Sequence, residues 1–121
     1  MSKQKRVVSK MIYFNKMWKN IQTNKKWKRH VKELEYNNVN LKEYLIIDVR
    51  SKREFKEAHL NGAINIPLCE IKKKAEIVIK DKNKKLIICC EYGIRSRKAV
   101  EILEDLGYAQ VYNLKGGLEN I

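Results

Sequence analysis

The cysteine at the end of an apolar run is the residue of this sequence best placed for nucleophilic chemistry. Residues 86–90 read LIICC, and the next six residues, EYGIRS, contain Gly93 and Arg95. Glycine lets a loop turn tightly enough for backbone N–H groups to converge on one sulfur atom or one bound anion. Arginine adds a full positive charge nearby, and both features favour a thiolate over a thiol. The pattern therefore predicts that Cys90 is an activated nucleophile.

Two predicted strands and one predicted helix would position this loop. Residues 45–47 and 86–88 are short, fully apolar runs typical of buried strands, and a helix is expected over 96–106. The start of that helix presents unpaired N–H groups and the positive end of its dipole to the loop. Ligands of parallel α/β sheets bind beyond the carboxyl ends of the strands, so the residues after the first strand are expected at the same edge as Cys90.

The rest of the pattern predicts an α/β domain. Further short strands are expected near 31–34, 63–66 and 111–112, and further helices at 51–58 and 70–79. Ser51 and Glu54 have the spacing of a capping box at the start of the first of these helices. The buried face of the second is predicted to comprise Ile71, Ala75, Val78 and Ile79. The strands alternate with helices and are apolar throughout, which indicates a parallel sheet covered by helices on both faces.

Charge divides the chain into two parts. The 121 residues include 27 Lys and Arg against 14 Asp and Glu, a formal net charge of +13. Residues 1–30 hold ten of the basic residues and none of the acidic ones, so this segment supplies +10 of the total. The asymmetry predicts a basic N-terminal segment, 1–30, and a nearly balanced domain, 31–121.

Apolar residues of the basic segment recur at helical spacing. They are Val7, Met11, Phe14, Trp18 and Ile21. The spacing predicts an amphipathic helix, which would pack on its own domain or bind an anionic membrane surface or an acidic partner. Nucleic acid is disfavoured because no recognised nucleic-acid motif is present. A transit peptide stays open, although such segments favour Arg and Ser over Lys.

Three cysteines without a secretory pattern indicate a reducing compartment. An odd number of thiols does not suggest a disulfide framework, so we expect a cytoplasmic protein, peripheral at a membrane if the basic segment binds one. No apolar run approaches the roughly 18 residues needed to cross a bilayer. No Cys and His spacing suits zinc, and neither a metal nor a cofactor is expected.

Three segments together resemble a known family. CEYGIRS, residues 90–96, resembles the active-site loop C-x-x-G-x-R-S of rhodanese-like sulfurtransferases. IIDVRSKREFKEAHLNGAINIPL, residues 46–68, resembles the family's other signature, and VYNLKGGL, residues 111–118, resembles the end of its domain. The resemblance covers about 31–121 and implies a three-layer α/β domain with a central parallel sheet of about five strands. The family often has a Trp and a further helix after the Gly-Gly, which suggests a thinly covered edge here that the basic segment could fill.

The resemblance also implies the chemistry. Cys90 would take a sulfane sulfur from a donor such as thiosulfate and pass it, through a persulfide, to cyanide, a thiol or a protein. Arg95 and the loop N–H groups would hold the anionic donor and stabilise the persulfide. The loop residues assigned to substrate binding are Glu91, Tyr92, Gly93, Ile94 and Ser96.

Flanking residues receive expected roles as well. Asp48 is expected to hydrogen-bond to the loop or to Arg95, and Arg50 to attract the anion or to anchor Glu54. Glu91 is expected to face solvent, because a negative charge beside the nucleophile opposes a thiolate.

Other candidate residues receive structural roles. Cys89 should point to the opposite side of its strand from Cys90 and belong to the core. Cys69 is expected to be structural or half exposed. His59 could be a general base, but a structural, hydrogen-bonding histidine is favoured because an activated thiolate needs no base.

Three alternatives to a sulfurtransferase stay open. A phosphatase or arsenate reductase of the related class would have five residues between its Cys and Arg, whereas four separate Cys90 from Arg95. A non-catalytic binding module is opposed by the intact Cys90. A sulfur carrier that docks through its basic segment combines a catalytic with a binding role.

Overall fold

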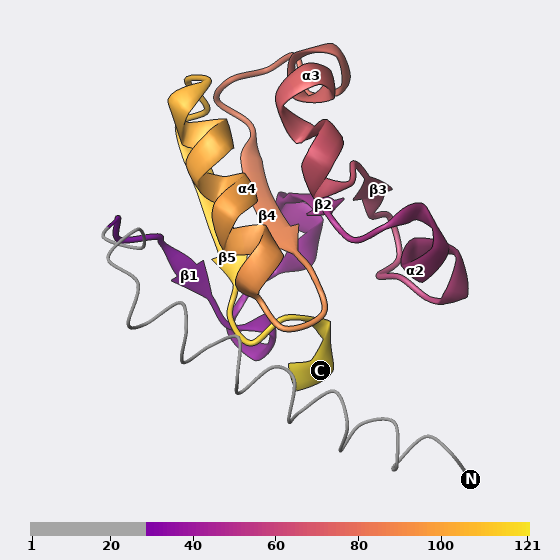
Figure 1. The fold of residues 1–121 in the computed structure, drawn as a ribbon. Helices are drawn as coiled ribbons and strands as arrows, with labels where there is room; N and C mark the ends of the chain where they lie inside the picture. The colour runs from indigo at the N-terminus through magenta and orange to yellow at the C-terminus, as the bar shows by residue number, and fades with distance from the viewer. Residues whose placement is uncertain (1–28) are drawn as a thin grey trace, which may run out of the picture. The chain divides into compact units, whose positions relative to one another are not determined.

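A five-stranded parallel sheet forms the centre of the protein (Figure 1). The computed structural model describes residues 29–121, and Val31–Ile121 make up one compact unit. The strand order is β1-β5-β4-β2-β3. The strands are β1 (Glu33–Leu34), β2 (Leu45–Asp48), β3 (Ile64–Asn65), β4 (Lys85–Cys89) and β5 (Gln110–Leu114). The predicted α/β class with about five parallel strands is therefore confirmed.

Two long helices cover one face of the sheet. α3 (Leu68–Val78) and α4 (Ile94–Asp105) pack side by side over β4 and its neighbours (Figure 1). Ile71, Ala75 and Ile79 follow one another at four-residue spacing and are at most 2% exposed. The prediction that Val78 is buried was wrong. It is the last residue of α3, lies off that line and is 41% exposed.

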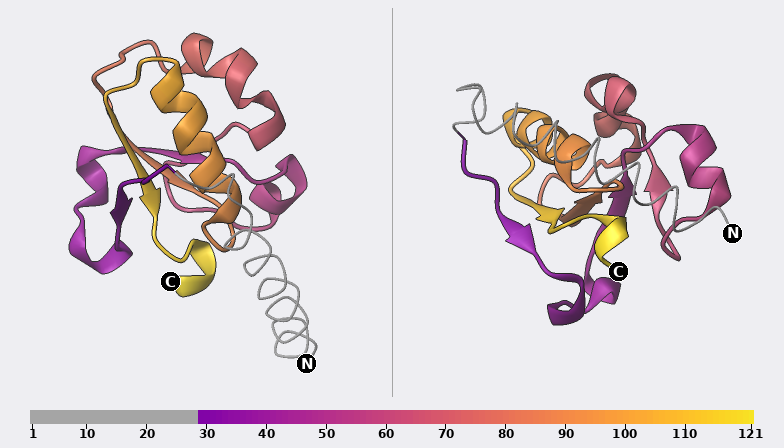
Figure 2. Two further views of the ribbon diagram at one scale, coloured as in Figure 1. Left: turned by 60° about the vertical axis from the view of Figure 1, so that its left-hand side comes forward. Right: turned by 60° about the horizontal axis from the view of Figure 1, so that its bottom comes forward.

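Short 3-10 helices line the opposite face. These are η1 (Tyr36–Asn38), η2 (Leu41–Glu43) and η3 (Leu118–Asn120), seen on the other side of the sheet from α3 and α4 in Figure 2. Their apolar residues contact a small cluster formed by Ile46, Ile87, Cys89 and Leu114. Side chains alternate across a strand, so consecutive residues of β4 enter different cores.

The helix boundaries follow from local chemistry. α2 (Lys52–Glu57) begins with the predicted capping box, in which the Ser51 hydroxyl accepts from the Glu54 N–H and the Glu54 carboxylate accepts from the Ser51 N–H. α4 begins two residues earlier than predicted, directly after Gly93 at φ +84°. That left-handed conformation strongly favours glycine and turns the chain from the loop into the helix.

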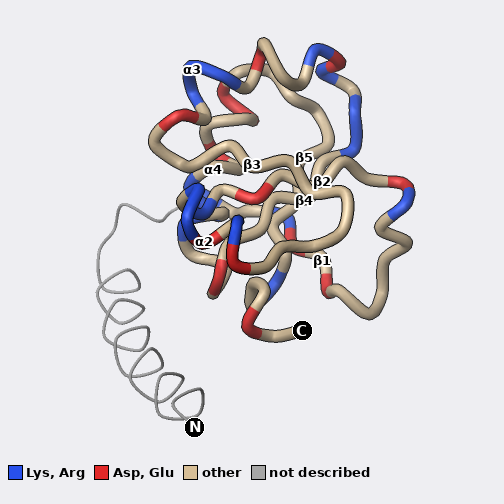
Figure 3. Tube along the Cα trace, turned by 90° about the vertical axis from the view of Figure 1, so that its right-hand side faces the viewer, with Lys and Arg blue, Asp and Glu red and all other residues tan. Residues whose placement is uncertain are grey.

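Charge is mixed over the described domain. Lys and Arg positions are interspersed with Asp and Glu around the chain (Figure 3). Between residues 29 and 121, none of the helices is both long enough and apolar enough to cross a membrane. The interpretations of the basic segment fall almost wholly on residues 1–28, outside the described part of the chain, and remain predictions.

Candidate active site

Backbone N–H groups converge on the sulfur of Cys90. This residue directly follows β4, is 1% exposed and accepts hydrogen bonds from the N–H of Gly93 at 3.1 Å and of Ser96 at 3.3 Å. The Ser96 hydroxyl lies 3.2 Å from the same sulfur. N–H donors and the dipole of α4 both favour negative charge at this position. The geometry is therefore that of a cradle for an anionic sulfur.

The C-terminal segment orients this loop. The N–H groups of Leu118 and Glu119 donate to the carbonyl oxygens of Cys90 and Glu91, both at 2.8 Å. Gly117 makes this approach feasible, because a Cβ there would lie 2.5 Å from the Glu91 oxygen. With its carbonyl groups held on that side, the loop keeps N–H groups directed at the sulfur.

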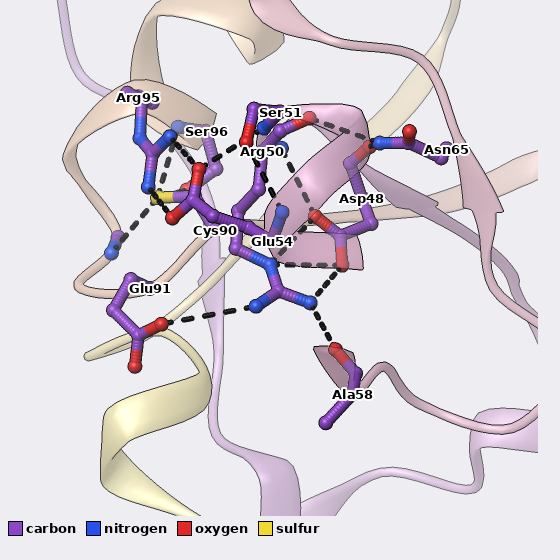
Figure 4. Close-up of polar contacts among 11 residues, drawn as sticks. Asp48, Arg50, Ser51, Glu54, Ala58, Asn65, Cys90, Glu91, Arg95 and Ser96 are labelled. Carbon is purple, nitrogen blue, oxygen red and sulfur yellow. Dashed lines mark hydrogen bonds and ion pairs between the residues drawn. The ribbon is translucent and has the colours of Figure 1, made fainter. Parts of the chain in front are cut away.

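Arg95 forms a bidentate ion pair with Glu54 of α2. The distances are 2.7 Å and 2.9 Å, and the two side chains are 38% and 33% exposed (Figure 4). The hydrogen bonds from Arg95, with help from those of Ser51, lower the pKa of Glu54 to about 2 despite partial burial. The pKa of Arg95 is raised, first by its hydrogen bonds to Glu54 and then by the charges of Glu54 and Cys90. The guanidinium therefore stays charged and acts electrostatically on the site.

Asp48 pairs with Arg50, and the expected contact of Asp48 with the loop or Arg95 was wrong. The Asp48 carboxylate accepts from the Arg50 backbone N–H at 3.0 Å and from its guanidinium at distances down to 2.7 Å. Both side chains are buried, and the contact is bidentate and charge-assisted. Burial opposes the charge of Arg50, but the hydrogen bonds and charge of Asp48 raise its pKa.

The guanidinium of Arg50 contacts Ala58 and Glu91 instead of anchoring Glu54. Its Nη2 donates to the Ala58 carbonyl oxygen at 2.6 Å, and its Nη1 lies 3.8 Å from the Glu91 carboxylate. The expectation that Glu91 faces solvent was therefore wrong, and its side chain is 18% exposed. The attraction of Arg50 offsets the cost of placing an acid beside Cys90.

Two asparagines at the site, Asn65 and Asn113, received no role from the sequence. Asn65 of β3 donates from its amide to the carbonyl oxygens of Asp48 and Arg50, both at 2.9 Å, and so fixes the turn after β2 (Figure 4). Asn113 of β5 is 1% exposed and accepts a short hydrogen bond from the Ser96 hydroxyl. The only signal for Asn113 was a polar residue within the otherwise apolar end of a strand.

The other two cysteines differ from Cys90. Cys89 is fully buried in the opposite core, as predicted, and burial, together with the charges of Asp48 and Cys90, raises the pKa of its thiol. Cys69 is an exposed free thiol at the start of α3.

His59 makes a hydrogen bond, as predicted. Its Nδ1 lies 2.7 Å from the Phe55 carbonyl oxygen, and its ring stacks on the Phe55 ring with centroids 3.7 Å apart. Within residues 29–121, no three His, Cys, Asp or Glu side chains are placed to hold a metal ion together.

Comparison with known proteins places the chain in a family. Residues 25–121 match the model of the rhodanese-like domain. The chain is 43% identical over 75 residues to thiosulfate sulfurtransferase PspE of Escherichia coli (strain K12), which covers 62% of this chain and 71% of that protein. It is 38% identical over 74 residues to the uncharacterised protein YqhL of Bacillus subtilis (strain 168), covering 61% of this chain but only 57% of that protein.

A solved structure supports the same placement. The structure described as rhodanese with anions from E. coli superposes with a TM-score of 0.59 and 40% sequence identity, over 64% of this chain and 91% of that one. Together with the parallel sheet and the loop after β4, these matches define a rhodanese-like domain. The chain belongs to the rhodanese-like sulfurtransferase family.

Proposed function

We propose that this protein is a sulfurtransferase that carries a sulfane sulfur as a persulfide on Cys90. The Cys90 thiolate attacks the outer sulfur of a donor such as thiosulfate. A new S–S bond forms while the S–S bond of the donor breaks, and sulfite leaves with the bonding electron pair. An acceptor nucleophile, such as cyanide, a thiol or a protein, then attacks the outer sulfur of the persulfide. With cyanide this yields thiocyanate and returns the Cys90 thiolate.

The observation that carries this proposal is the pair of N–H donors on the sulfur of Cys90. The groups belong to Gly93 and Ser96, at 3.1 Å and 3.3 Å, and the C-terminal segment holds the loop through two backbone hydrogen bonds. Donors that are fixed before the reaction stabilise developing negative charge without reorganisation. The assigned loop, Glu91 to Ser96, thus acts mainly through its backbone.

Arg95 would contact the anionic donor while it remains paired to Glu54. Glu54 accepts from Nη1 and Nη2 of Arg95. A guanidinium carries five N–H donors, so further donors are present for a sulfonate oxygen. The opposing charge of Glu54 would weaken the affinity for a doubly charged donor such as thiosulfate more than for a singly charged persulfide.

Asp48 and Arg50 would support the loop rather than touch the donor. Their side chains are buried, with Arg50 directed to Asp48, Glu91 and the Ala58 carbonyl oxygen. Disruption of this pair would leave a buried charge without its partner, so we expect loss of stability to accompany any loss of activity.

Thiocyanate formation from thiosulfate and cyanide tests the proposal. The wild-type chain and Cys69→Ala, which removes the exposed thiol, should both turn over. Cys90→Ala should show only the uncatalysed rate, and a phosphate ester should remain uncleaved by all three proteins. Equal turnover by Cys90→Ala and the wild type would refute the role of Cys90. Hydrolysis of the ester that depends on Cys90 would favour the phosphatase class.

The basic segment, 1–30, would serve docking in this scheme. All three cysteines are free thiols, which suits the reducing cytoplasm, and a basic segment would hold the domain at an anionic membrane surface or an acidic protein acceptor. Deletion of residues 1–27 should then leave cyanide-dependent turnover unchanged and abolish sedimentation with anionic vesicles or an acidic acceptor. A fall in thermal stability upon the same deletion would instead show that the segment packs on its own domain.

A further inference from the structure

A chain of buried polar side chains leads away from the sulfur of Cys90. The Ser96 hydroxyl contacts that sulfur at 3.2 Å and donates a short hydrogen bond to the side-chain oxygen of Asn113 on β5. All three residues are at most 1% exposed. Because these side chains are buried, their polar atoms are expected to find their hydrogen-bond partners within the protein.

The orientation of the Asn113 amide is determined by its other partners. The amide nitrogen donates to the Gly93 carbonyl oxygen at 3.2 Å and to the Glu33 carboxylate at 3.1 Å. Both partners can only accept hydrogen bonds, so the group that faces them must be the NH₂. The side-chain oxygen of Asn113 therefore faces Ser96 and has to accept a hydrogen there.

Ser96 has a single hydroxyl hydrogen to give. Since Asn113 receives it, the Ser96 oxygen presents a lone pair to the sulfur of Cys90. A Cys90 thiol can donate to that lone pair, whereas a thiolate would face it as a second acceptor. The hydroxyl thus acts in the opposite direction from the backbone N–H groups of Gly93 and Ser96, which donate to the sulfur.

We propose that Asn113 is a positioning residue that holds the Ser96 hydroxyl hydrogen away from Cys90, so that the hydroxyl stabilises the thiol while the backbone N–H groups of Gly93 and Ser96 stabilise the thiolate. Asn113 thereby opposes the backbone N–H groups in the balance between the thiol and the thiolate of Cys90. The proposal concerns the acid–base state of Cys90, and in the proposed function that state decides how fast the donor is attacked.

Several charged groups surround Cys90 and stay unchanged in the experiment below. The charged and titratable groups on the elements around it are Asp48 of β2, Arg50 of the turn after β2, Glu54 of α2, Cys89 of β4, Glu91 of the loop, Arg95 of α4 and Glu33 of β1. The tested substitutions replace only uncharged side chains and so change no formal charge, and the double variant separates the effect of the Ser96 hydroxyl from the loss of the Asn113 hydrogen bonds to Glu33 and Gly93.

The test is the rate of Cys90 alkylation by iodoacetamide as a function of pH, resolved by peptide mass spectrometry in the full chain. Ser96→Ala deletes the hydroxyl but keeps the backbone N–H donor. The midpoint of the pH dependence of its Cys90 alkylation rate should fall by about half a pH unit to one unit, which corresponds to the free energy of about one hydrogen bond. Asn113→Leu releases the hydroxyl hydrogen to the sulfur, and its midpoint should also fall by about that amount. In the Ser96→Ala background, Asn113→Leu should add little.

Opposite results would overturn the proposal. If the Ser96 hydroxyl donates to the thiolate, Ser96→Ala raises the midpoint instead of lowering it. If Asn113 acts only through packing, Asn113→Leu shifts the midpoint equally with and without the Ser96 hydroxyl. Should Asn113→Leu fail to fold, the sign of the Ser96→Ala shift still decides. Alkylation requires no sulfur transfer, so this result is independent of the thiocyanate test of the proposed function.

Discussion

Cys89 and Cys90 are neighbours in the chain and almost equal in exposure, at 0% and 1%. They nevertheless enter opposite cores, because side chains alternate across β4. The sulfur of Cys90 meets two N–H donors and the start of α4, whereas burial and negative neighbours raise the pKa of Cys89. Burial alone therefore does not distinguish these two thiols, whereas the direction of the surrounding dipoles does.

Removal of each thiol in turn gives the largest expected contrast. Cys90→Ala should lower kcat/KM for thiosulfate by about a thousandfold or more, because the proposed nucleophile is lost. Cys89→Ala should keep kcat/KM within about threefold and lower stability by about 1 kcal/mol. Thiocyanate formation and urea unfolding measure the two effects. A loss of activity in Cys89→Ala that is as large as in Cys90→Ala would end the distinction between the two thiols.

A substitution at Gly117 can disrupt the contact between the C-terminal segment and the loop after Cys90. Gly117→Ala would place a Cβ 2.5 Å from the Glu91 oxygen at φ +68° and ψ −168°, a conformation open essentially to glycine only. We expect a loss of about 3 kcal/mol or more in unfolding free energy.

Gly62→Ala is the matched control for this substitution. Gly62 also has a positive φ, +83°, but no atom lies within 4 Å of its added Cβ, so the cost should be only about 1–2 kcal/mol. Urea unfolding compares the two variants. Equal losses of unfolding free energy in the two variants would show that the close approach of Gly117 to the Glu91 carbonyl oxygen contributes nothing to stability.

Arg95 sharpens the comparison because it acts on Cys90 and is absent from the core around Cys89. Arg95→Gln should raise KM for thiosulfate about tenfold through the loss of one charge-assisted contact, about 1.4 kcal/mol. Arg53→Gln, at a side chain that is 92% exposed, should leave KM unchanged. Steady-state kinetics decide, and an unchanged KM in Arg95→Gln would exclude a role in donor binding.

The smallest expected effect is on unfolding free energy at acidic pH, which depends on the Glu54 carboxylate that pairs with Arg95. Its pKa falls from 4.5 in the unfolded chain to about 2 in the folded protein. The folded state therefore binds this proton less readily, so the stabilisation is present above about pH 4.5 and is lost as the pH falls toward 2.

Glu54→Gln tests this linkage and preserves the capping box, since Gln also serves at that position. Because the ion pair is about one third exposed, its contribution should be only about 1 kcal/mol after solvent screening. The wild type should exceed Glu54→Gln in unfolding free energy by about this amount at pH 7, and the difference should shrink below about pH 4.5 and vanish below about pH 2. A difference that is constant between pH 7 and pH 2.5 would contradict the assignment.

Local and periodic features could be predicted from the sequence. The apolar runs of β2 and β4, the Ser51–Glu54 capping box, the opposite orientations of Cys89 and Cys90, and the start of a helix close to Cys90 all depend on residues that are near one another in the chain.

Contacts that depend on tertiary geometry could not be predicted. Arg95 meets Glu54 across 41 positions, and Asn113 meets Glu33 across 80. Asp48 could have paired with either of two arginines, and only the turn held by Asn65 shows that it pairs with Arg50. A buried strand residue with a polar side chain, as at Asn113, is the one local sign of such a network.

The central claim is that Cys90, and not Cys89 or Cys69, carries a transferable sulfur. The most direct test is the intact-protein mass of the wild type and of Cys90→Ala after treatment with thiosulfate, and then with cyanide. The account predicts that the wild type gains one sulfur atom and loses it to cyanide as thiocyanate, whereas Cys90→Ala gains none. A sulfur gained equally by Cys90→Ala, or no gain in the wild type with thiosulfate or with a low-molecular-weight persulfide, would contradict it.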